Sequence, residues 1–135
     1  VLNLGSQLMT EIRHHHTIAP IHMRRVVLES PYAGDVEANI AYARACIRDS
    51  LLRGEAPIAS HLLYTQAGIL NDDDPHERSH GINAGHAWLF SNLHAVVVYT
   101  DRGISPGMQA GINSAQFHRV PIEYRTIAPQ PAFEK

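Results

Sequence analysis

The stretch HAVVVYT, residues 94–100, is the clearest strand signal in the chain, because a run of β-branched residues lies between polar ends. Three other short apolar runs have the same character: RRVVLES at 24–30, APIAS at 56–60 and VPIEYRT at 120–126. Each strand is separated from the next by a segment with helical periodicity. This alternation predicts an α/β fold in which a parallel sheet carries helices on its faces.

Three helices are expected between these strands. The first spans 36–52, with Asp35 as its cap and Gly54 after its end. The second spans 75–91, with Asp74 as cap and Pro75 as first residue, and the third spans 108–118. Residues 61–74 are expected to form a long loop. The helix faces expected to pack on the sheet are Val36, Ile40, Ala43, Ile47 and Leu51 in the first helix, and Gly81, Ile82, Gly85 and Leu89 in the second.

Length and composition limit the possibilities. A chain of 135 residues with 44% hydrophobic and 18% charged residues fits one globular domain, expected over 23–127, with a flexible leader at 1–22 and a loose tail at 128–135. A net charge of −2 gives no basic field for nucleic acid or an anionic membrane, and no apolar run is long enough to span one. The single cysteine, Cys46, excludes an internal disulfide, fits a cytoplasmic protein and is expected to be a small apolar residue on a helix face.

The segment HERSHGINAGH, residues 76–86, contains the His-Glu-x-x-His pattern of zinc proteases. His76 and His80 share one helix face, Glu77 could act as a base, and His86 could be a third ligand. However, an unbroken helix places His86 about 15 Å from His76, too far for one ion. We therefore expect no metal site, and a zinc protease remains a remote alternative.

Three loops should gather at the carboxyl ends of the parallel strands, where such sheets bind ligands. These loops are 30–35, 61–74 and 100–107. In the first, Tyr32 could stack on a base or ribose or be a rim aromatic, and Asp35 is expected mainly to cap the following helix, although it could instead contact a sugar hydroxyl. In the third, Ser105 precedes a helix whose N-terminus could bind an anion, although Ser105 could equally serve only as a cap. His61 in the second loop is as often structural as functional.

Several motifs together carry a resemblance to a known family. SPYAGDVEANIAYAR, APIASHLLYTQ, INAGHAWL, VVVYTDRGISPGMQAGINSA and VPIEYR, within 24–126, resemble small phage and bacterial proteins of the nucleoside 2-deoxyribosyltransferase-like superfamily, of the DUF4406/DUF7768 type. The resemblance implies a Rossmann-like, flavodoxin-type three-layer sandwich with a mostly parallel sheet of about four or five strands. It also implies a nucleoside or nucleotide as ligand, cleavage or transfer at the N-glycosidic bond, no cofactor, and a homo-oligomer in which one subunit completes its neighbour's site.

The resemblance also assigns roles to residues. The family's nucleophilic glutamate falls on Gln109 and its assisting aspartate on His86, and neither is a carboxylate here. Because an amide cannot form a glycosyl ester, Asp101 or Glu77 would have to supply a base for direct hydrolysis. The alternative is a non-catalytic nucleotide-binding module. The catalytic candidates are therefore Gln109, His86 and Asp101, and the substrate-binding candidates are Ser30, Tyr32, Ala33, Gly34, Asp35, His61, Ser105, Gly107 and Met108.

Overall fold

The computed structural model describes residues 22–127, in which four strands form one parallel sheet in the order β2-β1-β3-β4. The elements follow in the order β1 (Arg24–Glu29), α2 (Val36–Leu52), β2 (Glu55–Ile58), α3 (Ser60–Leu63), α4 (Pro75–Ala87), the 3₁₀ turn η1 (Trp88–Phe90), β3 (Ala95–Tyr99), α5 (Pro106–Phe117) and β4 (Ile122–Arg125). Every strand is joined to the next through a helix, as parallel pairing requires.

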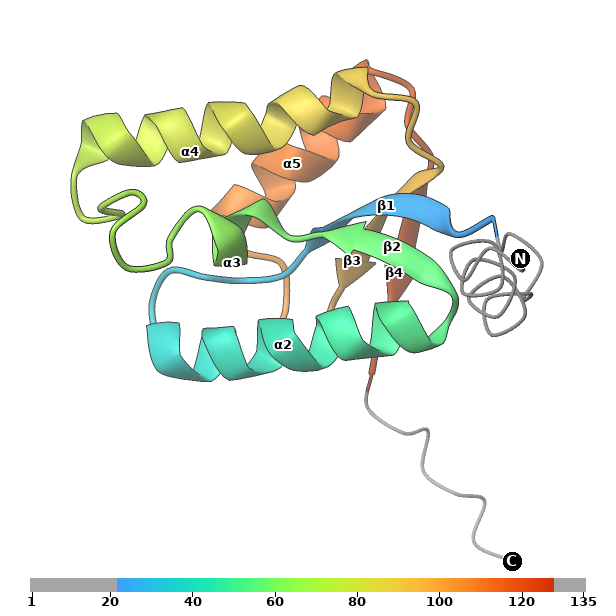
Figure 1. Cartoon of the computed structure of the whole chain (residues 1–135), viewed down its shortest axis with the longest axis horizontal. Coiled ribbons are helices and arrows are strands. Elements are labelled where there is room, and N and C mark those ends of the chain that lie inside the picture. The colour runs from blue at the N-terminus through green and yellow to red at the C-terminus, as the bar shows by residue number, and fades with distance from the viewer. Residues whose placement is uncertain (1–21, 128–135) are drawn as a thin grey trace, which may run out of the picture.

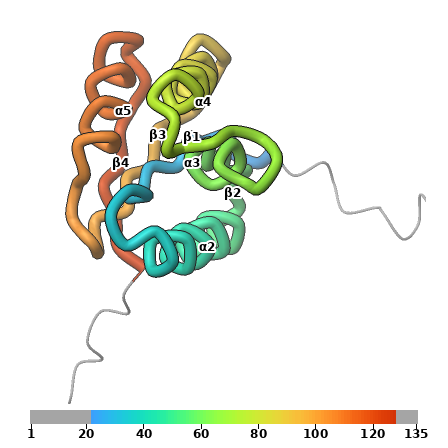
Figure 2. Tube along the Cα trace, turned by 90° about the vertical axis from the view of Figure 1, so that its left-hand side faces the viewer, coloured from blue at the N-terminus to red at the C-terminus, as the bar shows by residue number. Residues whose placement is uncertain are grey.

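The sheet lies between two helical layers. Figures 1 and 2 show α2 on one side of the sheet and α4 and α5 on the other. Side chains that alternate along the strands fill two separate cores: Val26, Leu28, Val97 and Tyr99 face α2, whereas Val27, Val96 and Val98 face α5. All five residues of β3 are buried, because this central strand is covered on both faces. The expected α/β, Rossmann-like three-layer architecture is confirmed.

The helix boundaries agree with the capping signals. The helix α2 spans the predicted residues, and the Asp35 side chain accepts a hydrogen bond from the backbone N–H of Ala38 at 3.3 Å. The helix α4 begins at Pro75, where Asp74 caps it as predicted, but it ends at Ala87 and continues as the tighter turn η1. The prediction of an unstructured loop over 61–74 was wrong at its start, because α3 forms one helical turn there.

The buried faces of the helices agree only in part with those expected: Ala43 is buried and Ile47 packs against the core as predicted. In α2 the residues that face the sheet are Asn39, Ala43, Cys46 and Ser50, whereas Val36 and Leu51 are 37% and 49% exposed. Small and polar residues occupy this face because they allow α2 to approach the strands, and Asn39 and Ser50 find hydrogen-bond partners there. The expected burial of Cys46 is confirmed.

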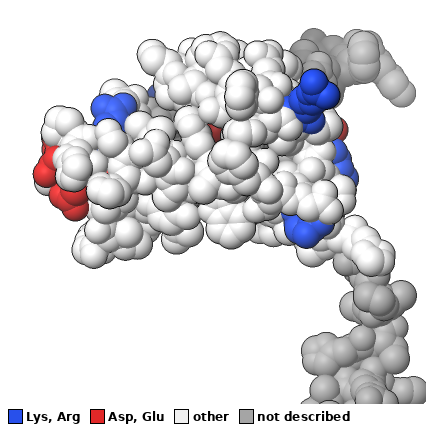
Figure 3. Space-filling model, turned by 90° about the horizontal axis from the view of Figure 1, so that it is seen from above, with Lys and Arg blue, Asp and Glu red and all other residues white. Residues whose placement is uncertain are grey.

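The helix α4 packs against α3 as well as lying over the sheet. A Cβ atom at Gly85 would overlap the hydroxyl of Ser60, so this glycine allows the two helices to touch. Leu89 is buried as expected, but Ile82 is 45% exposed, because it lies on the side of α4 that lines a pocket. Viewed from the side of α4 and α5, the surface is mostly uncharged, with acidic side chains gathered at one end (Figure 3).

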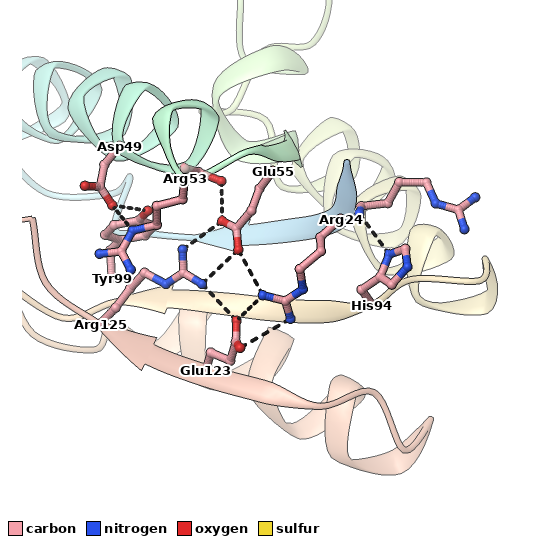
Figure 4. Close-up of polar contacts among 10 residues, drawn as sticks. Arg24, Asp49, Arg53, Glu55, His94, Tyr99, Glu123 and Arg125 are labelled. Atoms are coloured by element: carbon pink, nitrogen blue, oxygen red, sulfur yellow. Dashed lines mark hydrogen bonds and ion pairs between the residues drawn. The ribbon is translucent and has the colours of Figure 1, made fainter. Parts of the chain in front are cut away.

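An ion-pair network joins the two edge strands across the face of the sheet that α2 covers (Figure 4). Arg125 of β4 donates to both oxygens of Glu55 in β2, at 2.7 and 3.0 Å, and Arg24 donates to Glu55 Oε2 at 3.2 Å. The two arginines also pair with Glu123, and Ser50 donates to Glu55 Oε1 at 2.8 Å. The network fixes β4 to β2 although the two strands are not neighbours.

The predicted tail at 128–135, and the predicted leader except for His22, lie outside the described residues. Within residues 22–127, no helix combines the length and the apolar character that a membrane crossing needs.

Candidate functional site

A pocket of about 280 Å³ opens at the carboxyl ends of β1 and β2. All three predicted loops contribute to it, and α4, which carries the predicted candidates His86 and Glu77, forms a further wall. Figure 2 is viewed from the end of the molecule at which α3 and the first turns of α2, α4 and α5 gather. The lining residues are Glu29, Ser30, Tyr32, Ala33, Ser60, His61, Tyr64, Thr65, Leu70, Asp72, Glu77, Arg78, Gly81, Ile82, His86, Ser105, Pro106, Gly107, Met108 and Ala110.

The loop after β1 is held in place by a buried amide. Asn39 of α2 donates to the backbone carbonyls of Tyr32 at 2.9 Å and Ala33 at 3.1 Å, and its side-chain oxygen accepts from Arg102 Nε at 3.0 Å. These bonds satisfy loop carbonyls that no sheet partner reaches. Tyr32 therefore enters the pocket from a fixed backbone, as an aromatic group against which a planar ligand can stack.

Ser30 and His61 meet in the lining of the pocket. Ser30 follows β1, and His61 is the second residue of α3, which comes just after β2, so the pairing of these two strands brings the side chains together. Ser30 Oγ lies 2.7 Å from His61 Nε2, and Ser30 is only 4% exposed. Burial lowers the pKa of His61 to about 4, so the imidazole is neutral at neutral pH.

Glu29 is the most unusual group in the pocket, and sequence reasoning missed it. It is the last residue of β1, and among residues 22–127 its carboxyl group has no hydrogen-bond or ion-pair partner. The carboxyl group lies against Gly111 of α5, where a Cβ atom would overlap it. Burial raises the pKa of Glu29 to about 8, so the group is mostly protonated at neutral pH. The available signal was a charged residue at the carboxyl end of an otherwise apolar strand.

The helix α4 and the preceding loop supply the remaining polar groups. His86 Nδ1 lies 3.3 Å from the hydroxyl of Ser114 on α5, and burial, with a smaller contribution from the charge of His118, lowers its pKa. Tyr64 accepts a hydrogen bond from Trp88 Nε1 at 3.2 Å, which positions a second aromatic ring at the pocket. Asp72, Glu77 and Arg78 complete this wall.

The structure brings most of the sequence-predicted residues together. Eight of them line the pocket: Ser30, Tyr32, Ala33, His61, His86, Ser105, Gly107 and Met108. Ser105 also caps α5, where its hydroxyl accepts from the N–H of Met108 at 3.2 Å.

Four predicted residues do not line the pocket. Gly34 forms the turn before α2 with φ of +102°, and Asp35 caps that helix. Asp101 accepts hydrogen bonds from the hydroxyl of Tyr42 at 2.6 Å and the N–H of Ile127 at 3.1 Å, so its carboxylate serves the turn after β3. Gln109 is exposed on α5 and bonds to Asn113 at 2.9 Å.

The His-Glu-x-x-His segment lies at the start of α4. The rings of His76 and His80 contact each other edge to face with centroids 5.0 Å apart, whereas His86 lies in the pocket. In the described part of the chain, no group of three or more His, Cys, Asp or Glu side chains is placed to hold a metal ion.

Comparison with known proteins gives a family but no function. Searches of curated proteins and of solved structures found no match. One family model covers residues 24–125, which include every strand and helix of the fold and the whole pocket. The chain therefore belongs to the family described as a domain of unknown function, DUF7768.

Proposed function

We propose that this protein binds a nucleoside or nucleotide and cleaves its N-glycosidic bond. The observation that carries the proposal is the Glu29 carboxyl group, which has no partner in the described chain and belongs to a residue that lines the pocket. A group with a pKa of about 8 holds a proton at neutral pH and can deliver it to a departing base. Glu29 thus supplies an acid that neither Gln109 nor His86 provides.

The shape and lining of the pocket support a ligand of this class. Its volume of about 280 Å³ lies just below the usual range for small-molecule sites, roughly 300–1,000 Å³. Tyr32 and Tyr64 offer aromatic surfaces for a base, and polar groups of α4 and of its preceding loop offer hydrogen bonds. The resemblance to nucleoside 2-deoxyribosyltransferase-like proteins points to the same ligand class.

The test is release of free base from a panel of nucleosides, deoxynucleosides, their monophosphates and NAD, followed by chromatography. We expect one of these substrates to be cleaved, and we expect Glu29→Gln to lower kcat by about 10²–10⁴-fold, the usual range for loss of a general acid. Glu37→Gln makes the same change on the exposed first turn of α2 and should leave kcat unaltered. Absence of released base from every substrate contradicts the proposal.

Gln109 provides a second discriminating variant. It is exposed and bonded to Asn113, so Gln109→Ala should retain activity. If Gln109→Ala lowers kcat as much as Glu29→Gln does, the catalytic residue is at position 109, as the resemblance indicates, and not at Glu29.

A non-catalytic nucleotide-binding module is the second candidate. The observation that favours it is that Gln109 and His86 stand where the resemblance implies carboxylates. Under this reading, nucleotides raise the melting temperature of the protein without any release of base. In that case Glu29→Gln should retain the thermal shift.

A further inference from the structure

We propose that Ser30 and His61 form a proton relay that activates the attacking water, so that the pocket hydrolyses its substrate in one displacement with inversion at the sugar carbon. This inference rests on the proposed function and specifies its mechanism. It also assigns a role to the closest contact between two side chains of the pocket, the 2.7 Å approach of Ser30 Oγ to His61 Nε2.

The fold places this pair with little freedom. The neighbouring strands β1 and β2 run parallel with Val27 opposite Ile58. Ser30 directly follows β1, and His61 comes three residues after the end of β2. Ser30 is nearly fully buried, and His61 is held in the first turn of α3. In the tautomer with its proton on Nδ1, His61 accepts the Ser30 proton at Nε2. The lone pairs of Ser30 Oγ can then accept a proton from a water molecule in the pocket.

Glu29 is the complementary acid. It is adjacent to Ser30 in sequence, lines the same pocket and has no other partner among residues 22–127. With a pKa of about 8 for Glu29 and about 4 for His61, the carboxyl group holds a proton and the imidazole lacks one throughout the neutral range. Two groups whose environments push their pKa values apart in this way have the protonation states of an acid and a base before the substrate arrives.

Attack by water and departure of the base occur in one step. Water attacks the anomeric carbon, and its proton passes to Ser30 Oγ while the Ser30 proton passes to His61 Nε2. The C–N bond breaks, its electron pair goes to the base nitrogen, and that nitrogen takes the Glu29 proton. The products are the free sugar and the free base. Glu29 then regains a proton from solvent and His61 loses one to solvent, which restores the starting state.

The other charged or titratable groups of the pocket besides the tyrosines belong to α4 and the loop before it. Asp72 precedes α4, and Glu77, Arg78 and His86 lie on α4. The activity should therefore follow a bell-shaped pH profile with limbs near pH 4 and pH 8, each shifted by the summed charge of this wall. If a carboxylate of the same wall attacks the sugar instead, the product keeps the anomeric configuration of the substrate. The anomeric configuration of the product therefore distinguishes the two mechanisms.

The stereochemical test uses the wild-type protein with the substrate found above, in buffer containing methanol. Methanol replaces water as nucleophile, and the methyl glycoside keeps its anomeric configuration long enough for NMR. We expect a β-nucleoside to give the α-methyl glycoside. Formation of the β-anomer overturns the relay while leaving N-glycosidic cleavage intact.

The relay variants give a second test. Ser30→Ala and His61→Ala should each lower kcat by about 10²–10³-fold with KM nearly unchanged. The limb near pH 4 should disappear in His61→Ala, and added imidazole should restore part of its activity, which a merely structural histidine would not allow. Unchanged kcat in folded Ser30→Ala protein overturns the relay. If no substrate releases base at all, the proposed function fails, and the relay fails with it.

Discussion

Two glutamates on neighbouring strands, Glu55 buried and Glu29 half-buried, have opposite surroundings. Glu55 at the start of β2 is 2% exposed, and its carboxylate accepts hydrogen bonds from Arg125, Arg24 and Ser50 (Figure 4). Glu29 at the end of β1 has no hydrogen-bond or ion-pair partner in the described chain and lies against the backbone of α5 at Gly111. One carboxyl group faces the α2 layer, and the other faces the pocket beneath α4 and α5.

The comparison shows that partners, rather than burial, decide what a carboxyl group does. Burial raises the pKa of Glu55 as well, but hydrogen bonds from Arg125 and Ser50 and the charges of both arginines outweigh burial, so its pKa is lowered. Nothing opposes burial at Glu29, and its pKa rises to about 8. Glu55 is therefore a permanent anion that joins strands, whereas Glu29 can exchange its proton where ligands enter.

The largest effect is expected from removing the paired carboxylate. Glu55→Ala leaves Arg125, whose side chain is 10% exposed, without its two-point partner, and should lower the free energy of unfolding by about 3–5 kcal/mol. Urea denaturation at pH 7 measures this loss. The same change at the exposed Glu37 should stay within about 0.5 kcal/mol. A loss at Glu55 as small as this would mean that the network does not fix the edge strands.

Removing the Glu29 carboxyl group should raise the free energy of unfolding, the opposite of the effect expected at Glu55. The folded pKa of Glu29 lies above its unfolded value of 4.5, so the folded state binds the proton more tightly, and stability falls as pH rises from 4.5 to about 8. Glu29→Gln removes this dependence and should stabilise the protein at pH 7 by up to about 3 kcal/mol. At pH 4 the gain should vanish. Denaturation curves at both pH values check the sign, and destabilisation at pH 7 would contradict the pKa assigned to Glu29.

The architecture could be predicted from the sequence, because its signals are local. The β-branched run of β3 and the caps at Asp35 and Asp74 depend on neighbouring residues only, and they gave the parallel sheet and the starts of α2 and α4. The rule that ligands bind at strand ends then located the loops that line the pocket.

The chemistry of the pocket could not be predicted in the same way, because it depends on contacts between distant segments. In the sequence, Glu29 is only the last residue of a strand. Its role depends on Gly111 of α5, which is distant in sequence and leaves space for the Glu29 carboxyl group. The buried face of α2 could not be predicted for a related reason. Asn39 and Ser50 can be buried because Asn39 donates a hydrogen bond to a loop carbonyl and Ser50 donates one to Glu55. The spacing of apolar residues cannot reveal a buried helix face whose polar side chains form hydrogen bonds.

Acid should reveal a further titratable group with a shifted pKa, the half-buried His61. Its folded pKa of about 4 lies below the unfolded value of 6.5, so its contribution to stability is present above pH 6.5 and is lost as pH falls through 4. At pH 5 this contribution should be smaller than at pH 7 by about 2 kcal/mol. His61→Gln should flatten the stability profile over this interval. A variant profile as steep as that of the wild type would assign the acid sensitivity to other groups.

The smallest expected change in stability, and the closest test of the comparison, is Gly111→Ala. The added Cβ would overlap the Glu29 carboxyl group, which is the flexible end of a side chain and can turn into the pocket. Alanine in place of glycine favours the helix by about 1 kcal/mol, which should offset the cost of moving the carboxyl group, so stability at pH 4 should change by less than about 1 kcal/mol.

The displaced carboxyl group meets water, so its pKa should fall towards 4.5, and the decline in stability between pH 4.5 and 8 should become shallower. Gly107→Ala adds a Cβ to the same helix with only ordinary contacts and should leave that decline unaltered. If both variants keep the wild-type pH dependence, the close approach of Glu29 to α5 is not what raises its pKa.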